Sequence, residues 1–300
     1  MNFVSQKIAN KFEVNFCSVQ ESKKTQPFVS EVAEMSCQEC AEVYGRALIE
    51  VQKQNNFEDV VAKIFRNQNV DIIRKFPNLD DGARISARKI IEDSKGRHYS
   101  SIRVCEKKEL DGRKNVYVLD ETQGTVDIYD DTGKIISHYS KQDMDALYYY
   151  KYHPDAIHQY LRLDRLIYSG NFASELLDII PRLETIFNNN KLVQKTQKPI
   201  TLYRAMHLGI DEIEKFGKVF CDNSFVSTST NYETAERFAG LNMPIAQIEI
   251  PVNTKYINMD NLFNIDRKHW CEDEILLDAQ NSFEILDVDR KNNTISLRLI

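Results

Sequence analysis

The second half of the chain carries a succession of short apolar runs, and this pattern constrains the fold more than any other feature. The runs alternate or hold β-branched and aromatic residues, which is typical of β-strands. They lie at Ile200–Met206, Lys218–Ser229, Ala246–Ile250, Glu274–Leu277, Phe283–Val288 and Ile295–Ile300. The last two are separated by Lys291-Asn292-Asn293, which predicts a hairpin. A short helix is expected over Thr234–Leu241.

In the residues before this half, the spacing of apolar residues changes twice, from helical to strand-like and back to helical. Helical spacing of apolar residues predicts helices over Glu31–Gln54, Asn56–Arg66 and Leu79–Asp93. Residues 98–138 then read as a short antiparallel meander, because Gly-containing turns separate β-branched runs. Helical spacing returns over Asp145–Leu166 and Phe172–Phe187, where Pro154 and Pro181 are each able to kink or split the helix.

Helices followed by a strand-rich half indicate an α+β fold class. With 300 residues the chain is long for one average domain. We therefore expect a helical N-terminal region of unknown role at 1–95, a small β-rich segment at 96–138 and a C-terminal domain at 139–300.

Composition excludes several classes of function. A net charge of −6 argues against nonspecific nucleic-acid binding, which needs surplus Lys and Arg to neutralise phosphates. A basic stretch between Lys63 and Lys89 is interpreted as the solvated face of helices, and docking onto an acidic partner or an anionic membrane surface is the alternative. No run approaches the ~18 apolar residues of a transmembrane helix, so no stable membrane insertion is expected.

The six cysteines are scattered, which indicates reduced thiols rather than a disulfide framework. Cys37-x-x-Cys40 has no second Cys or His pair at zinc-finger spacing, and it lies in the first expected helix. We therefore interpret both cysteines as buried apolar residues and expect no metal site.

Three polar elements stand on the strand-like runs, in the order Tyr203-Arg204, Ser227-Thr228-Ser229 and Glu272-Asp273-Glu274. On a strand, residues two apart share a face, so the two glutamates of the third element are expected to point into one cleft. A second Glu-x-Glu, at Glu212 and Glu214, precedes the Ser-Thr-Ser run and lies in a helix-like stretch. Residues two apart on a helix do not share a face, so this copy is set aside.

The ordered Arg, Ser-Thr-Ser and Glu-x-Glu elements resemble the Arg/Ser/Glu clade of mono-ADP-ribosyltransferases, and the resemblance covers roughly residues 140–300. It implies a mixed α/β catalytic domain of two packed sheets with flanking helices, and NAD as co-substrate without a metal. It implies that Arg204 contacts the NAD phosphate and ribose and that Ser227 orients the catalytic Glu274. Glu274 would stabilise the cationic ribose, and Glu272 would take the proton from the acceptor.

The resemblance also implies further NAD contacts at Ala205, Thr228, Ser229 and Phe238, although helical spacing favours a core position for Phe238. The family usually has Gly where Ala205 stands, and Ala serves equally unless φ must be positive. A loop between Asp260 and Cys271 would read the protein target through Phe263, His269 and Trp270. As the only Trp, Trp270 is either a core residue or an exposed anchor for the partner.

The resemblance implies an enzyme that transfers ADP-ribose from NAD to a protein side chain, with arginine as the leading acceptor because relatives with two glutamates modify arginine. An NAD glycohydrolase and a non-catalytic binding module are the alternatives. The N-terminus lacks the apolar region of a signal peptide. We expect a bacterial effector that leaves its cell by another route and acts in host cytoplasm, or a phage-encoded enzyme acting inside bacteria.

Overall fold

The computed structural model describes residues 57–79, 82–162, 171–240, 243–263 and 272–300. The expected helix over Glu31–Gln54, with Cys37 and Cys40, lies outside the described residues. Within those ranges, no helix combines the length and the hydropathy needed to cross a membrane.

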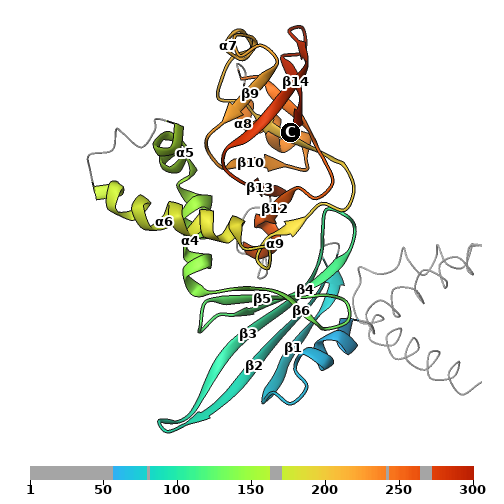
Figure 1. Ribbon diagram of the computed structural model, residues 1–300. Helices are drawn as coiled ribbons and strands as arrows, with labels where there is room; N and C mark the ends of the chain where they lie inside the picture. The colour runs from blue at the N-terminus through green and yellow to red at the C-terminus, as the bar shows by residue number, and fades with distance from the viewer. Residues whose placement is uncertain (1–56, 80–81, 163–170, 241–242, 264–271) are drawn as a thin grey trace, which may run out of the picture. The chain divides into compact units, whose positions relative to one another are not determined.

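The first described part is an antiparallel meander in which each strand pairs with the next (Figure 1). Its strands are β1 Val70–Leu79, β2 Gly82–Asp93, β3 Gly96–Lys108, β4 Lys114–Asp120, β5 Thr125–Tyr129 and β6 Ile135–Tyr139. The helix at residues 57–64 confirms the helix expected there and packs on one face of the sheet. Its Phe57, Val60 and Val61 are buried against Ile85 and Val104.

The expectation of a helix over Leu79–Asp93 is wrong, because this stretch contains β2. Ala83, Ile85 and Ala87 are buried in strand alternation. Gly82 has φ of 104°, and a Cβ there would meet the carbonyl oxygen of Glu106 at 2.2 Å. The sheet therefore begins at Val70, and the β-rich segment expected at 96–138 is part of it.

In the described ranges the meander is followed by the helices α4 Lys141–Tyr152, α5 Pro154–Arg162 and α6 Asn171–Asn188. Ser140 caps α4, since its hydroxyl accepts from the Asp143 amide while the Asp143 carboxylate accepts from the Ser140 amide. Pro154 is the first residue of α5, the position that tolerates a missing N–H, and it separates α5 from α4. Pro181 lies inside α6 without ending it.

The strands after residue 193 belong to one hydrogen-bonded sheet in the described part of the chain, ordered β7-β12-β13-β10-β8-β11-β15-β14-β9. Their bounds are β7 Gln194–Lys195, β8 Ile200–Ala205, β9 Val219–Asp222, β10 Val226–Ser229, β11 Ile245–Ile250, β12 Lys255–Asn258, β13 Glu274–Leu277, β14 Asn281–Asp289 and β15 Thr294–Leu299. The hairpin between β14 and β15 is confirmed. The run expected at Lys218–Ser229 forms two strands, β9 and β10.

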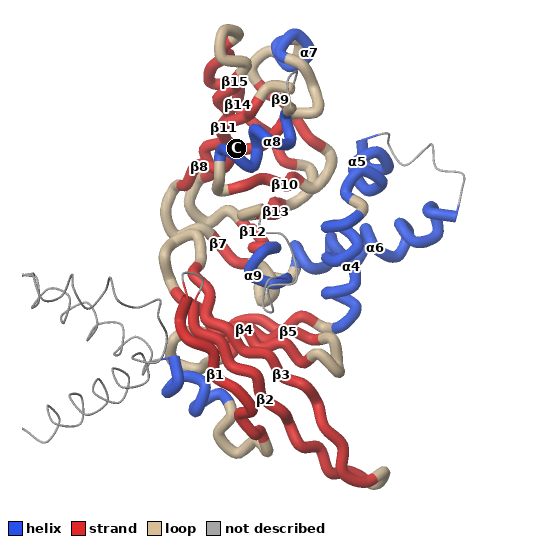
Figure 2. Tube along the Cα trace, turned by 180° about the vertical axis from the view of Figure 1, so that it is seen from behind, coloured by secondary structure: helices blue, strands red, loops and turns tan. Residues whose placement is uncertain are grey.

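The helices that join these strands in the part of the chain that the structure describes are short: α7 Ile210–Glu214, α8 Tyr232–Ala239 and α9 Met259–Phe263. Figure 2 shows α8 lying beside the strands of the large sheet, and along the chain α9 joins β12 to β13. The copy of Glu-x-Glu at Glu212 and Glu214 lies in α7, as the helix-like spacing indicates.

The large sheet has two halves that meet at a seam, the boundary between β10 and β8. Among the described residues, these two strands are paired at Ser229 and Tyr203 only. One apolar core holds residues of both halves, including Tyr256 and Ile275 from one and Leu202 from the other. The α+β class with two sheets and flanking helices is thus confirmed.

Candidate active site

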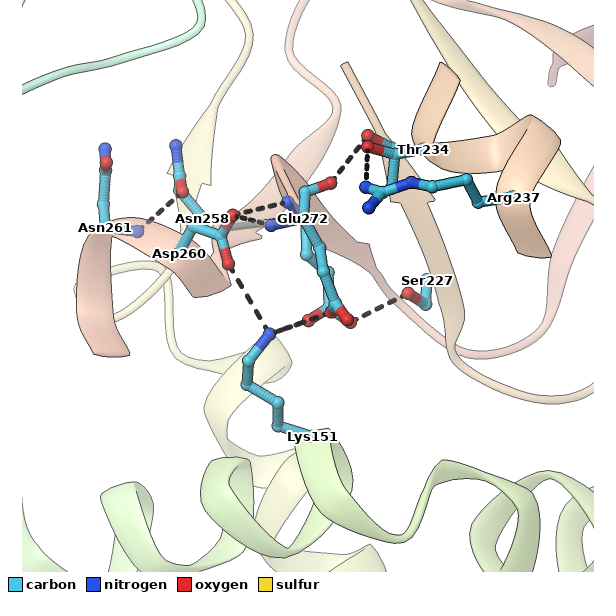
Figure 3. Close-up of polar contacts among 10 residues, drawn as sticks. Lys151, Ser227, Thr234, Arg237, Asn258, Asp260, Asn261 and Glu272 are labelled. Atoms are coloured by element: carbon cyan, nitrogen blue, oxygen red, sulfur yellow. Dashed lines mark hydrogen bonds and ion pairs between the residues drawn. The ribbon is translucent and has the colours of Figure 1, made fainter. Parts of the chain in front are cut away.

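The Ser-Thr-Ser element lies on β10, directly beside the Glu-x-Glu element. The two strands are antiparallel, with Ser229 opposite Glu274 and Ser227 opposite Leu276. The Ser227 hydroxyl donates to Oε1 of Glu274 at 2.8 Å (Figure 3). A hydrogen bond from a strand-held hydroxyl restricts the Glu274 rotamer, which is the geometry that the sequence resemblance implies for this pair.

The other two hydroxyls of this element hold the backbone of the glutamate segment. Thr228 donates to the carbonyl oxygen of Ile275 at 2.7 Å, and Ser229 donates to that of Glu272 at 2.7 Å. Ser229 also accepts from the amide of Asn231. Thr228 and Ser229, expected among the NAD contacts, therefore have hydrogen-bond partners within the protein.

Glu272 is brought to the same side as Glu274 by a turn rather than by strand alternation. β13 begins at Glu274, and Asp273 just before it has φ of 52°, a left-handed conformation that Asp tolerates. Asp260 on α9 stabilises this turn, because its Oδ2 accepts from the amides of Glu272 at 2.7 Å and Glu274 at 3.3 Å. The expected proximity of the two glutamates is observed, whereas the strand argument for Glu272 is wrong.

Lys151 joins the two glutamates. Its side chain comes from the last turn of α4 and is 7% exposed. Nζ lies 2.8 Å from Oε2 of Glu274, 3.2 Å from Oε2 of Glu272 and 3.5 Å from Oδ1 of Asp260 (Figure 3). Sequence reasoning missed Lys151. It lies four positions after Leu147, which is buried, so the two residues share one face of α4, and this spacing could have placed Lys151 on the inner face of the helix.

The pKa values of Glu274 and Lys151 in this cluster are shifted from their ordinary values. Burial raises the pKa of Glu274, and the Lys151 charge and the hydrogen bonds from Lys151 and Ser227 only partly oppose it. Burial alone would lower the pKa of Lys151, yet the attraction of Glu274, Asp260 and Glu272 raises it above the usual range. Lys151 is therefore a permanent cation between acidic groups.

Arg204 lies at the other side of the seam, on β8. Its Nη2 is 3.7 Å from Oδ2 of Asp222. Arg162 donates to both oxygens of the same carboxylate, from Nε to Oδ1 at 3.2 Å and from Nη2 to Oδ2 at 3.0 Å. Burial raises the pKa of Asp222, but the two arginines outweigh this and keep it below its usual range. Nη1 of Arg204 is buried and has no hydrogen-bond partner among the described residues.

An orphaned guanidinium N–H of this kind fits an anionic oxygen of a ligand, since burying it unpaired carries a free-energy penalty. NAD, the co-substrate that the resemblance implies, carries such oxygens on its pyrophosphate, so this donor fits it. Asp222 and Arg162 come from elements outside the three sequence motifs. The sequence analysis accordingly missed both.

The remaining expected site residues have different surroundings. Ala205 ends β8 and has no positive φ, so Ala causes no backbone strain there. Phe238 on α8 is 64% exposed, which excludes the core position that its spacing favours. Phe263 is 9% exposed in the core formed with α4 and α6, so it offers little surface to a target, contrary to expectation. His269 and Trp270 lie outside the described residues.

Residues 125–300, more than half of the chain, match the family model of the ADP-ribosyltransferase exoenzymes. The chain therefore belongs to the ADP-ribosyltransferase exoenzyme family. The expectation of an ADP-ribosyltransferase is confirmed at this level. No curated protein sequence matches the chain.

Several solved structures resemble this fold. The ADP-ribosyltransferase toxin Plx2a from Paenibacillus larvae is 14% identical over 54% of this chain and 87% of its own, with a TM-score of 0.41. The C3 exoenzyme of Clostridium limosum is 19% identical over 54% and 86%, with a TM-score of 0.42. The Vis toxin of Vibrio splendidus is 20% identical over 54% and 74%, with a TM-score of 0.41.

Proposed function

We propose that this protein transfers the ADP-ribose unit of NAD to an arginine side chain of a protein and releases nicotinamide. The observation that carries the proposal is the convergence of Glu272 and Glu274 on one ammonium group, with Oε2 atoms 3.2 and 2.8 Å from Nζ of Lys151. Two carboxylates that share a single cation face the same space, as a reaction with one electrophile and one nucleophile requires.

The proposed chemistry divides the work between the glutamates. The bond between the ribose C1′ and the nicotinamide nitrogen breaks, and its electron pair leaves with nicotinamide. Glu274 stabilises the positive charge that develops on the ribose and accepts a hydrogen bond from a ribose hydroxyl. Arg204 supports this role by offering a charged fork, with Nη1 unpartnered among the described residues, to the pyrophosphate.

The arginine acceptor rests on Glu272. A guanidinium has a pKa above about 12, so it becomes a nucleophile only when a base removes its proton. The Glu272 side chain is 35% exposed, so it is accessible to an incoming side chain, while Glu274 is buried beneath it. The new bond forms between C1′ and the guanidinium nitrogen, and the proton passes to Glu272.

The acceptor protein is proposed to belong to a host cell, with the enzyme acting there as a toxin-like effector. Membership of the exoenzyme family supports an acceptor protein in a host cell. The proposal concerns where the acceptor is found and does not alter the roles of Glu272 and Glu274.

The test combines two acceptors. The full chain is incubated with labelled NAD and either agmatine, a small guanidine, or a lysate of eukaryotic cells, and nicotinamide release and labelled products are measured. We expect labelled agmatine and a labelled protein band whose modified residue is arginine by mass spectrometry. Release of nicotinamide with no labelled acceptor indicates a glycohydrolase, and absence of release contradicts the proposal.

A further inference from the structure

Lys151 is more closely tied to the glutamates than any group that sequence reasoning assigned to the site. Its Nζ contacts Glu274 and Glu272 and lies 3.5 Å from Asp260, so three carboxylates surround one ammonium. The side chain is 7% exposed, as buried as Glu274 at 9%. A charge held this far from water is retained only when it is paired.

The groups that face Glu274 come from several elements. Ser227 on β10 holds Oε1, Lys151 on α4 contacts Oε2, and the amide of Glu274 donates to Asp260 on α9. Glu272 repels Glu274, and the buried hydroxyl of Tyr150 on α4 lies within its electrostatic influence. Lys151 is thus the cation that counters the acidic groups around Glu274 in the described part of the chain.

Without this cation, the cluster would place like charges side by side in a poorly hydrated space. A carboxylate in such surroundings takes up a proton near neutral pH, because both desolvation and repulsion disfavour its ionised form. A protonated Glu274 has no negative charge with which to stabilise a cationic ribose. The two glutamates would also lose the shared contact that draws them to one side.

We propose that Lys151 is a positioning residue for the reaction: its ammonium keeps Glu274 ionised and holds Glu272 and Glu274 on the same side of the site. This inference rests on the proposed function. Lys151 has no need to leave, because each carboxylate oxygen has two lone pairs and the oxygens contacted by Lys151 and Ser227 can still accept a ribose hydroxyl.

The first experiment uses the full chain with Lys151→Met and Lys151→Arg, and measures kcat and KM for nicotinamide release between pH 5.5 and 8.5. For Lys151→Met we expect kcat at pH 6 to fall by ~10- to 100-fold. Loss of the opposite charge raises the pKa of Glu274, so the acidic limb of the curve of kcat against pH moves upward by ~1–3 pH units. KM for NAD should change less than kcat. Lys151→Arg keeps the charge and should restore the acidic limb.

Two controls sharpen this result. Lys141→Met removes a lysine from the same helix, where it pairs with Asp145 at the surface, and should leave kcat unchanged. In Lys151→Ala, added propylammonium should restore turnover, whereas 1-propanol, of similar size and uncharged, should not. If Lys151→Met does not fold, Lys151→Gln carries the same expectation.

The second experiment needs no NAD. In protein labelled with carboxyl-¹³C glutamate, the Glu274 signal is assigned by its loss in Glu274→Gln and titrated with pH. We expect the Glu274 midpoint to be higher in Lys151→Met than in the wild type by ~1–3 pH units. If the wild type releases no nicotinamide, the proposed function fails, while this titration still tests the role of Lys151.

Three outcomes overturn the inference. An unchanged Glu274 titration and pH profile in Lys151→Met would show that the ammonium does not control the carboxylate. A higher kcat in Lys151→Met would identify the amine as a block on the site. An ADP-ribose adduct on Lys151 after incubation with NAD would identify it as an acceptor.

Discussion

At the scale of single residues, Glu274 combines a fixed direction with an altered acidity. Ser227 and Lys151 each hold one of its oxygens, and burial raises its pKa. Glu272 differs, because its side chain is partly exposed and its position depends on the turn at Asp273. The two carboxylates therefore suit different tasks, and substitutions should separate them.

Glu274→Ala is expected to abolish both transfer and NAD hydrolysis, since both need the ribose cation to be stabilised. Losses of ~10²–10³ in kcat are typical when one electrostatic stabiliser is removed. Nicotinamide release measures the effect, and circular dichroism checks the fold. Glu214→Ala, in the second Glu-x-Glu and outside the site, should retain full activity. Turnover by Glu274→Ala equal to that of the wild type would contradict the site assignment.

Glu272→Gln is expected to eliminate transfer to agmatine and to spare much of the NAD hydrolysis. Water needs less assistance from a base than a guanidinium does, because the guanidinium must lose a strongly held proton. The measurement is the ratio of labelled agmatine to free ADP-ribose. A parallel fall of both products would mean that Glu272 is not a dedicated base for the acceptor.

At the scale of elements, α9 and β13 are linked through Asp260, whose carboxylate accepts from two amides of the glutamate turn. Asp260→Ala should lower kcat for nicotinamide release by ~10-fold or more, because a small displacement of a catalytic group is costly. Asp278→Ala is the matched control, since Asp278 accepts from the amide of Ala279 at the other end of β13. It should affect thermal stability but not kcat; equal kcat losses would show a general effect on β13.

Helix α5 is held against Ser224 and Tyr150 by hydrogen bonds of a neutral histidine, His158. Nδ1 of His158 lies 2.6 Å from the Ser224 hydroxyl, and Nε2 lies 3.4 Å from the Tyr150 hydroxyl. Burial, aided by the charges of Arg204 and Arg162, lowers the pKa of His158 to about 3. The unfolded chain has the ordinary pKa of about 6.5 and binds the proton first as the pH falls.

The free energy of unfolding should therefore decrease as the pH falls below about 6.5, by ~1.4 kcal/mol per pH unit from His158. Urea unfolding at pH 7.5 and 5 should show a loss of ~2 kcal/mol from this group. His158→Gln should remove that part of the slope. An unchanged slope in His158→Gln would contradict the assignment.

The sequence was informative where contacts are local or lie between neighbouring strands. The apolar runs around Ser227 and Glu274 predicted strands there, and the resemblance implied a contact between these two side chains. β2 was mistaken for a helix because Ile90 and Ile91 mimic helical spacing while the buried positions Ala83 and Ala87 are small. Its strand identity comes from pairing with β3, a tertiary contact that no short window contains.

The site was only partly predictable for the same reason. Lys151 reaches Glu274 across 123 positions of sequence, and Arg162 reaches Asp222 across 60. A lysine near a helix end and an isolated aspartate on a strand have no distinctive spacing. Only the folded arrangement of α4, α5 and the large sheet brings these charges together.

At the scale of the whole molecule, the meander and the later elements share one apolar core. Cys105, Tyr117, Val126 and Ile128 of the meander are buried in the same cluster as Leu147, Leu183 and Leu276. Polar contacts reinforce it, since Gln194 donates to Tyr117 and Asn261 donates to the carbonyl oxygen of Lys108. The expected boundary between residues 138 and 139 therefore crosses a packed interior.

A chain that starts at Ser137 is expected to be insoluble or unfolded, whereas one that starts at Phe57 should fold and release nicotinamide. Each buried apolar side chain is worth ~1.5–3 kcal/mol, so losing four of them approaches the ~5–15 kcal/mol stability of a typical protein. Soluble yield and thermal unfolding of the two chains test this. A cooperative unfolding transition in the shorter chain would support a separate domain at 139–300.

At the seam between β10 and β8 the large sheet is held by fewer pairs of residues than between the neighbouring strands. Glu274 and Ser227 belong to one side of it and Arg204 to the other, and in the described residues the two strands that flank it, β10 and β8, are paired at Ser229 and Tyr203 alone. A small sliding of the halves changes the spacing of these groups while each half keeps its own ladder of hydrogen bonds. A dinucleotide held at its pyrophosphate by Arg204 and at its ribose by Glu274, as proposed above, would connect the two halves, so its binding should make this junction the stiffest place in the sheet rather than the weakest.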